Sequence, residues 1–285
     1  MTNLLSTIIL TYNEELNLPK LLSSLQKTNS SIYIIDSGSS DETINIAKQY
    51  NCNIYHHPFS THAEQWRWAL QTIPIETEWI LGLDADQSLS PQLQSELSNL
   101  FAQPEKLANI DGFFIKRRQI FQGTWIKHGG YYPKYLLKMF RKSKVRFDTL
   151  DLLDHHFIVD GNTAKLESDI LEENFKEYEL DFWLTKHIRY AKLHAKEEML
   201  RMQSVASWQV QPKLLGNPDQ QILWFKTLWY RFPLYWRAFG YFCLRYFLQL
   251  GFLDGEKGFV FHFLQAFWYR VLVDIEVAKN REAKK

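Results

Sequence analysis

Several features that mark other classes of protein are scarce in this sequence. The two cysteines, Cys52 and Cys243, lie far apart and form no metal-binding or redox spacing, which excludes a disulfide framework and indicates a reducing compartment. The formal net charge of +1 excludes a bulk attraction to nucleic acid. Glycine and proline number only 12 and 9, and we find no internal repeat, low-complexity tract or basic-then-apolar signal peptide. A chain of 285 residues with this composition is expected to be globular, with one elaborated domain or two smaller ones.

Long uncharged apolar runs are also absent, since none approaches the ~18–20 residues needed to span a bilayer. Aromatic side chains are abundant instead. Between residues 224 and 247, 12 of 24 residues are Phe, Tyr or Trp, and Arg231, Arg237 and Arg245 are interspersed among them. Rings with polar tips mixed with arginine suit the headgroup boundary, where an amphipathic helix lies in the membrane plane. We expect this region to contact a membrane surface, and an aromatic core or an oligomer interface is the alternative.

Four short apolar runs in the first part of the chain fit buried strands. They are residues 7–10, 32–35, 53–55 and 79–83. Each run is followed by a polar segment and then by the apolar spacing of a helix. Alternating strands and helices predict an α/β fold with a parallel sheet and right-handed crossovers, so the polar ends of the strands line one edge. After about residue 175 the pattern becomes helical, with a break around residues 211–218.

Asp84 and Asp86 directly follow the last of these runs. Two carboxylates one residue apart at the end of a buried strand suit a divalent cation, because Mg²⁺ takes oxygen ligands and keeps open positions for phosphate. Open α/β sheets also bind ligands in the crevice beyond this edge. The pair therefore predicts a site for a metal-bound diphosphate. The alternative is that both carboxylates cap the helix that Ser90-Pro91 opens.

Three motifs at the predicted strand ends resemble those of family 2 glycosyltransferases with the GT-A fold. They are Thr-Tyr-Asn-Glu-Glu at residues 11–15, Asp-Ser-Gly-Ser-Ser-Asp-Glu-Thr at 36–43 and Leu-Asp-Ala-Asp at 83–86. Further matches extend the resemblance over most of the chain, at residues 123–133, 138–140, 154–156 and 186–191. The chain is similar to bacterial enzymes that build lipopolysaccharide core or exopolysaccharide.

The resemblance implies a domain organisation and an activity. Residues 1–175 would form a Rossmann-like GT-A domain with a mostly parallel sheet flanked by helices, and residues 176–285 a helical, aromatic-rich, membrane-associating region. The implied enzyme transfers a sugar from a nucleotide-sugar donor to a hydroxyl of a lipid-linked or cell-surface glycan, usually with inversion and with Mg²⁺ or Mn²⁺ present. The expected location is cytoplasmic, peripheral on the cytoplasmic face of the inner membrane.

The resemblance also places four side chains around the nucleotide donor. Tyr12 would lie against the base and Asp36 at its hydrogen-bonding edge, while Asp84 would face the ribose and Asp86 the metal. An aromatic ring offers a stacking face, and carboxylates accept hydrogen bonds from ribose hydroxyls or a base N–H. Two structural alternatives remain open: Tyr12 packs within its own turn, and Asp36 accepts from the backbone amides of its Ser/Gly-rich turn.

Three further residues complete the predicted donor-binding set. Thr11 and Glu14 belong to the first motif, although a carboxylate such as Glu14 near a helix start is also common for dipole reasons. Gln65 sits where relatives carry Gln-Arg-Asn, and Trp66 and Arg67 depart from that pattern. A solvated helix face is the simpler interpretation of Arg67.

Transfer by single displacement needs a base near the acceptor hydroxyl and cations near the departing diphosphate. Relatives often carry Asp-Glu-His where this chain has Asp154, His155 and His156. We predict Asp154 as the base, with His155 as a substitute and Asp151 as a rival, and His156 as a metal or phosphate contact. Cations are expected from a nearby basic run, which a solvated basic edge would explain equally well. This run consists of Lys138, Arg141, Lys142, Lys144 and Arg146.

Two other classes of function remain open. A sugar nucleotidyltransferase should carry a Gly-rich, basic phosphate loop after the first strand, and residues 11–15 have neither feature. The other alternative is a non-catalytic module that binds a sugar nucleotide or a membrane, which His155 in place of Glu favours. Measured donor hydrolysis would distinguish this module from an enzyme.

Overall fold

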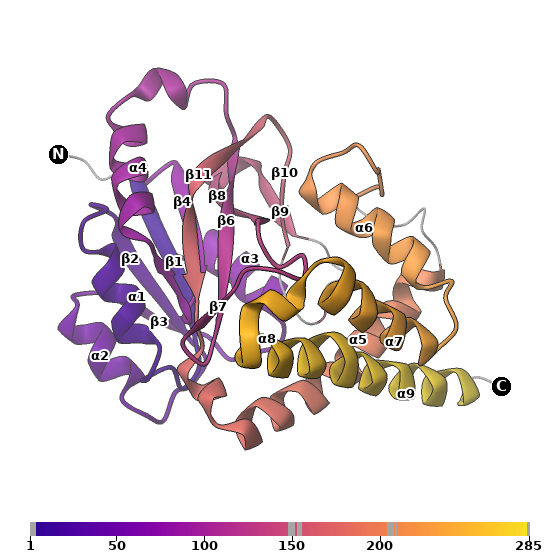
Figure 1. Ribbon diagram of the computed structural model, residues 1–285. Coiled ribbons are helices and arrows are strands. Elements are labelled where there is room, and N and C mark those ends of the chain that lie inside the picture. Colours follow the sequence, from indigo (N-terminus) through magenta and orange to yellow (C-terminus); the bar gives the residue numbers. More distant parts are fainter. Residues whose placement is uncertain (1–3, 148–151, 153–155, 204–207, 209, 284–285) are drawn as a thin grey trace. The chain divides into compact units, whose positions relative to one another are not determined.

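The computed structural model describes residues 4–147, 152, 156–203, 208 and 210–283 (Figure 1). Its contacts divide the chain into two compact units, each with its own core. The first unit consists of Met1–Ile120, Lys134–Phe147 and His156–Lys176. The second unit includes Phe121–Pro133 and Glu177–Lys285.

Four parallel strands of the first unit confirm the four predicted apolar runs. They are β1 (Leu5–Thr11), β2 (Ser31–Asp36), β3 (Asn53–His56) and β4 (Trp79–Asp84). Helices follow them, as the apolar spacing predicts: α1 (Leu18–Leu25), α2 (Thr43–Gln49), α3 (His62–Thr72) and α4 (Pro91–Phe101). The α/β class is therefore confirmed.

The rest of the sheet is mixed in direction. Strand β8 (Lys134–Arg141) is antiparallel to β4 and to β6 (Gly112–Phe121). Strand β11 (Thr163–Glu172) is parallel to β6, and β5 (Gln87–Leu89) is antiparallel to β11. The order is β3-β2-β1-β4-β8-β6-β11-β5, so the carboxyl ends of β6 and β11 share an edge with those of β1, β2 and β4. A separate antiparallel pair joins β9 (Val145–Phe147) and β10 (Phe157–Val159), and short 3₁₀ turns occupy Pro104–Lys106 and Lys142–Lys144.

Apolar side chains alternate between the two faces of this sheet, and helices cover both faces. In β1, Ile8 lies on one face and Ile9 on the other, and both are fully buried. Helices α1, α2 and α4 pack on the face of Ile9, whereas Trp66 and Ala69 of α3 pack on the face of Ile8. Burying one such side chain stabilises the fold by about 1.5–3 kcal/mol. Burial on both faces explains why these strands are continuous apolar runs rather than alternating ones.

The second unit is helical, as the periodicity after residue 175 predicts. Its helices are α5 (Leu180–Gln203), α6 (Pro218–Trp229), α7 (Trp236–Cys243), α8 (Gly255–His262) and α9 (Tyr269–Glu282). A 3₁₀ turn at Gly251–Asp254 and π-helical segments at Leu244–Leu248 and Phe263–Trp268 lie between these helices. The strand β7 (Thr124–Ile126) and the 3₁₀ turn Phe175–Tyr178 precede the helices in the chain. Asn217 and Gln220 form a capping box that starts α6 directly after the predicted break. Within the described residues, no helix has both the length and the apolar character needed to cross a membrane.

The arginines of the aromatic segment do not share one environment, so they cannot all contribute to a headgroup contact in the same way. Arg231 is exposed, but the Arg237 side chain is fully buried, 2.9 Å from Glu198 and 2.5 Å from Asp274. Two buried carboxylates compensate this guanidinium, so it needs neither water nor a phosphate headgroup. Arg245 stacks on two tyrosine rings, with ring centroids 4.4 and 4.6 Å from its guanidinium carbon.

Candidate functional site

Three polar turns meet at one edge of the sheet, as the alternating pattern predicts. Thr11 pairs with Asp36 across β1 and β2, and Leu10 pairs with Asp84 across β1 and β4. Neighbouring strands lie about 4.8 Å apart, so the polar ends of three strands occupy one short stretch of the edge. This edge is where open α/β sheets bind their ligands.

Asp36 faces into its own turn and is only 3% exposed. Its carboxylate accepts the backbone N–H groups of Gly38 and Ser39 at 2.8 and 2.9 Å and the Thr11 hydroxyl at 3.1 Å. Gly38 has a φ of +95°, which glycine adopts without the steric cost of a Cβ. Asp36 and Thr11 therefore fix the shape of the turn, which is the structural alternative considered above. The Ser39 hydroxyl also donates to this carboxylate, so its four acceptor positions are occupied, and a direct contact with a base requires the ligand to displace one of these donors.

Tyr12 is 59% exposed, so packing within its turn does not account for the ring. The backbone around it is held firmly instead. The Asn13 N–H donates to the Ser39 hydroxyl at 2.8 Å, and the Ser40 N–H donates to the Asn13 side-chain oxygen at 2.8 Å. These bonds join the turns after β1 and β2 and leave the Tyr12 ring accessible to a ligand.

Gln65 is buried behind the second turn. Its amide donates to the Ser37 hydroxyl at 2.7 Å and to the His57 carbonyl at 2.9 Å, and its carbonyl oxygen contacts the His57 ring. Gln65 thus supports the turn that Asp36 shapes. Arg67 forms an ion pair with Glu64 on the surface of α3, which agrees with a solvated helix face.

Asp84 and Asp86 lie partly exposed at the end of β4. The Asp84 carboxylate lies 2.8 Å from the ammonium group of Lys138, which is almost fully buried, and the Asp86 carboxylate accepts from the Asn174 amide at 3.1 Å. Helix α4 is capped by Ser90, whose hydroxyl accepts a backbone N–H of the first turn at 3.2 Å. The alternative that the two aspartates cap this helix is therefore wrong.

A polar network that the sequence analysis did not find links the ends of β1, β4 and β11. Asn174 donates to Asp86 and accepts from the Asn17 amide at 3.1 Å. Glu14 accepts from Asn17 at 2.7 Å and from the Lys176 ammonium group at 2.6 Å. The signal was the polar stretch Glu172-Glu173-Asn174 at the end of β11. Its position depends on the long-range pairing of β11 with β6, which local patterns do not reveal.

Lys138 of the basic run contacts the site, but Arg141 and Lys142 do not belong to it. Because β8 runs antiparallel to β4, Arg141 pairs with Trp79 at the start of β4 and its guanidinium stacks on that ring at 4.7 Å. The Lys142 ammonium group donates to a backbone carbonyl near the same end. The prediction that Arg141 and Lys142 assist a leaving group beside Asp84 is therefore wrong.

Asp84 and Asp86 fit a divalent cation that is shared with a diphosphate. Among the described residues, no three His, Cys, Asp or Glu side chains are arranged to hold a metal, so His156 does not complete such a group with them. Mg²⁺ is usually held by one or two carboxylates together with substrate phosphates. Because Asp84 pairs with Lys138, Asp86 is the better candidate ligand. The predicted base Asp154 and its alternatives at residues 151 and 155 lie outside the described residues.

Sequence comparisons point to one family. Residues 6–164 match the family described as Glycosyl transferase family 2. An uncharacterized glycosyltransferase of Rickettsia typhi is 31% identical over 98 residues, which are 34% of this chain and 33% of that protein. A TPR repeat-containing protein of Synechococcus elongatus is 27% identical over 214 residues, which are 72% of this chain and 47% of that protein. The matches thus span less than half the length of these curated relatives.

A solved structure supports the fold. A mannosyltransferase from Pyrobaculum calidifontis, in complex with GDP-Man and Mn²⁺, superimposes with a TM-score of 0.51 and 12% identity over 99% of this chain and 88% of that chain. At this identity the likeness concerns the fold alone, and it confirms the expected GT-A architecture. The family match covers more than half of the chain and includes all three strand-end motifs. The chain therefore belongs to Glycosyl transferase family 2.

Proposed function

We propose that this protein transfers a sugar from a nucleotide-sugar donor to a hydroxyl of a lipid-linked or cell-surface glycan, with inversion, during lipopolysaccharide or exopolysaccharide biosynthesis. The observation that carries the proposal is that the exposed Tyr12 and the partly exposed Asp84 and Asp86 lie at the ends of strands that share one edge of the sheet. A ring suits a nucleobase, and carboxylates suit a ribose and a metal-bound diphosphate. The mannosyltransferase of similar fold, in complex with GDP-Man and Mn²⁺, supports this choice of ligands.

The described contacts support a mode of donor binding. Tyr12 stacks on the base, and Asp84 accepts hydrogen bonds from the ribose. Thr11, Asp36 and Gln65 hold the turn beside the base in one shape before the donor arrives, so little ordering remains to be done on binding. The network through Glu14 and Asn174 fixes the carboxylate of Asp86 in the same way.

The chemical step requires a charged leaving group and a deprotonated acceptor. Asp86 would hold Mg²⁺ or Mn²⁺, which stabilises the negative charge of a departing diphosphate when bound. Lys138 adds a fixed positive charge beside Asp84. By resemblance we assign removal of the acceptor proton to Asp154, or to His155 in its place, and we keep His156 as a metal or phosphate contact.

Donor binding and turnover test this proposal. The unfolding temperature of the purified protein is measured with a panel of UDP-, GDP-, ADP- and CMP-linked sugars, each with Mn²⁺ or with EDTA. Release of the nucleotide from each sugar is measured as well. We expect one donor to raise the unfolding temperature, since a ligand at 100 times its Kd stabilises by about 2.7 kcal/mol. That donor should also be cleaved slowly. Pyrophosphate released from a nucleoside triphosphate and a sugar 1-phosphate would instead indicate a nucleotidyltransferase, and binding without cleavage a non-catalytic module.

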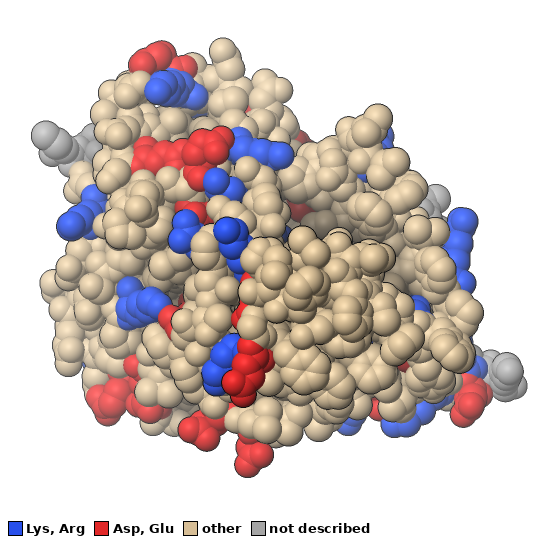
Figure 2. Space-filling view, in the orientation of Figure 1, with Lys and Arg blue, Asp and Glu red and all other residues tan. Residues whose placement is uncertain are grey.

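We further propose that the second unit contacts a membrane surface. Large apolar side chains are exposed on α7, α8 and the π-helical segments, where Trp236 is 75% and Leu248 is 77% exposed. Other members of this apolar face are Tyr235, Phe239, Phe247, Phe252, Phe259 and Phe263. Figure 2 shows a broad area of uncharged side chains over α7 and beside α8. Helix α8 itself begins with the exposed Glu256 and Lys257. Contiguous apolar patches of this kind mark a membrane or a partner, and ring-rich ones suit the headgroup boundary.

Liposome flotation tests the membrane contact. We expect the protein to float with anionic liposomes and to remain partly bound at high salt, because ring insertion is not screened as charge attraction is. Replacing Trp236, Phe239 and Phe247 together with Ser should abolish flotation. Phe59→Ser removes an equally exposed ring from the first unit and should have no effect. The apolar face would be an oligomer interface if the wild type floated with no lipid composition and the triple variant sedimented with half the mass of the wild type.

A further inference from the structure

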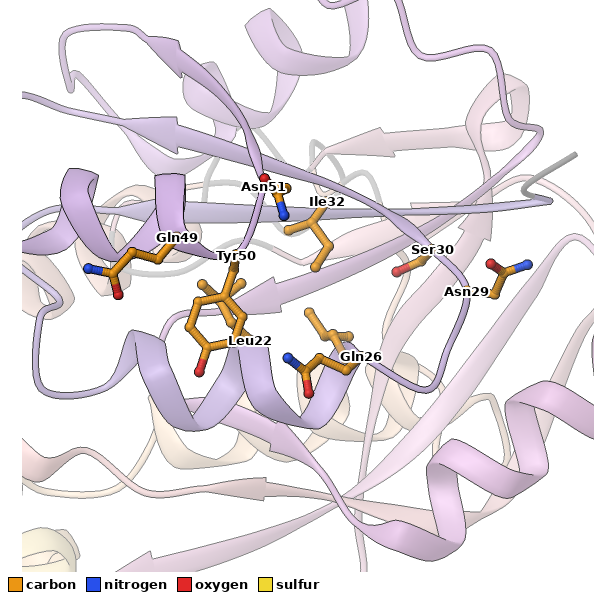
Figure 3. A pocket seen from close by; sticks show the side chains of 9 residues that line it. Leu22, Gln26, Asn29, Ser30, Ile32, Gln49, Tyr50 and Asn51 are labelled. Carbon is orange, nitrogen blue, oxygen red and sulfur yellow. The ribbon is translucent and has the colours of Figure 1, made fainter.

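A hollow of about 530 Å³ opens in the first unit, away from the site described above (Figure 3). Its walls come from the end of α1, the loop before β2, the start of β2 and the end of α2. Strand β2 begins beside this hollow and ends at Asp36, so the two sites lie at opposite ends of the strand, roughly 17 Å apart along it. The hollow is therefore not part of the donor-binding edge.

The lining of the hollow is amphipathic and carries no charge. Leu22, Leu25 and Ile32 form its apolar part, and the Tyr50 ring lies among them. The polar lining residues are Gln26, Asn29, Ser30, Gln49 and Asn51. Figure 3 shows the Gln26 amide beside the Tyr50 ring, Gln49 on the other side of that ring and directed away from it, and Asn51 near Ile32. Among the described residues that line it, there is no Lys, Arg, Asp or Glu.

The backbone at the hollow disfavours an anion, although several of the last helical carbonyls, such as those of Leu25 and Ala47, already accept hydrogen bonds within the chain. Both α1 and α2 end at the hollow, and the C-terminal end of a helix carries a partial negative charge on its last carbonyls. An anion such as a phosphate is disfavoured there, since no lysine or arginine offsets that charge. Asn29 and Asn51 have φ values of 50° and 55°, the left-handed conformation that ends a helix, and both residues line the hollow.

We propose that this hollow binds a neutral carbohydrate chain. A sugar ring has an apolar C–H face that suits Tyr50 and the leucines, and hydroxyl groups that pair with amides, which both donate and accept. A volume of this size lies within the usual range for small-molecule sites. The inference goes beyond the proposed transfer reaction: the site would hold part of a glycan at a distance from the donor edge. Binding there does not depend on Asp86, so either idea can fail without the other.

Nuclear magnetic resonance on protein labelled with ¹⁵N at Asn and Gln tests this site. The probes are maltohexaose, cellohexaose and chitohexaose, with a heparin hexasaccharide as the anionic comparison. We expect one neutral probe to shift the side-chain amides of Gln26, Gln49 and Asn51 with a Kd of roughly 1 mM or below, and heparin to leave them unshifted. The amide of Gln71, exposed on α3, is the internal reference.

Matched variants locate the binding. Asn29→Gly and Asn51→Gly remove amides while keeping the left-handed backbone that glycine adopts readily, so the fold is preserved. Combined with Gln49→Ala they should weaken binding about tenfold, whereas Tyr50→Phe, which keeps the ring, and Gln71→Ala should change it little. The proposal is overturned if no neutral probe shifts these amides at about 10 mM, if heparin shifts them more, or if the triple variant binds as the wild type does.

Discussion

Asp86→Asn is expected to lower metal-dependent donor turnover by roughly 10²–10³-fold, the usual effect of removing one electrostatic contact to a developing charge. The substitution keeps the shape of the side chain and an oxygen that can accept from Asn174, so the network at the strand ends survives. What it removes is the negative charge that a hard divalent cation requires. The stabilisation of the protein by Mn²⁺ together with a nucleoside diphosphate should disappear with the activity.

Two comparisons separate this effect from unfolding. A nucleoside without phosphates binds through the ring of Tyr12, so it should still raise the unfolding temperature of Asp86→Asn. Glu105→Gln removes an exposed carboxylate elsewhere in the first unit and should leave both turnover and the Mn²⁺ effect unchanged. Normal turnover in Asp86→Asn, with an unchanged response to Mn²⁺, would rule out Asp86 as the metal ligand.

Local sequence was enough to predict the parallel half of the sheet. Strands that are buried on both faces are continuous apolar runs, so β1, β2 and β4 could be recognised without knowledge of their neighbours. The start of α4 could also be predicted, because Ser90 before Pro91 is a local signal and Ser90 caps the helix. Strands β8 and β11 could not be placed in this way, since β8 pairs with β4 through contacts such as Leu81 with Met139.

The candidate site was predictable in position but not in orientation. That Asp36 and Asp84 share an edge follows from the alternating topology alone. The hydrogen bonds of these side chains depend on groups the sequence does not point to. Asp36 turns inward because its own turn offers two N–H donors, and Asp84 pairs with Lys138 because antiparallel β8 brings that lysine alongside. The same antiparallel direction carries Arg141 to the far end of β4.

Arg237→Met is expected to lower the free energy of unfolding by about 3–5 kcal/mol, which is the cost of breaking a buried ion pair from one side. The side chains of Arg237, Glu198 and Asp274 have no exposed surface. Asp274 also accepts the Tyr235 backbone N–H at 2.6 Å, so its carboxylate cannot turn away toward solvent. Loss of the arginine leaves two buried carboxylates without the counter-charge that contacts both of them. Urea denaturation of the wild type and the variant measures the difference.

The pH dependence of this loss distinguishes a buried ion pair from lost packing. Burial raises the pKa of Glu198 even in the wild type. Without Arg237 the pKa of Glu198 would lie higher still, because the positive charge that favours the carboxylate is gone. A carboxyl group whose folded pKa lies above its unfolded value stabilises more at low pH and loses that contribution as the pH rises through the folded value. The loss in free energy of unfolding caused by Arg237→Met should therefore be smaller at pH 4 than at pH 7. A loss caused by poorer packing would be the same at both pH values. Arg231→Met, an exposed neighbour in the same segment, should be within about 0.5 kcal/mol of the wild type at both pH values. An equally small effect of Arg237→Met would mean that this arginine is not an obligatory part of the core and would restore it as a candidate for headgroup contact.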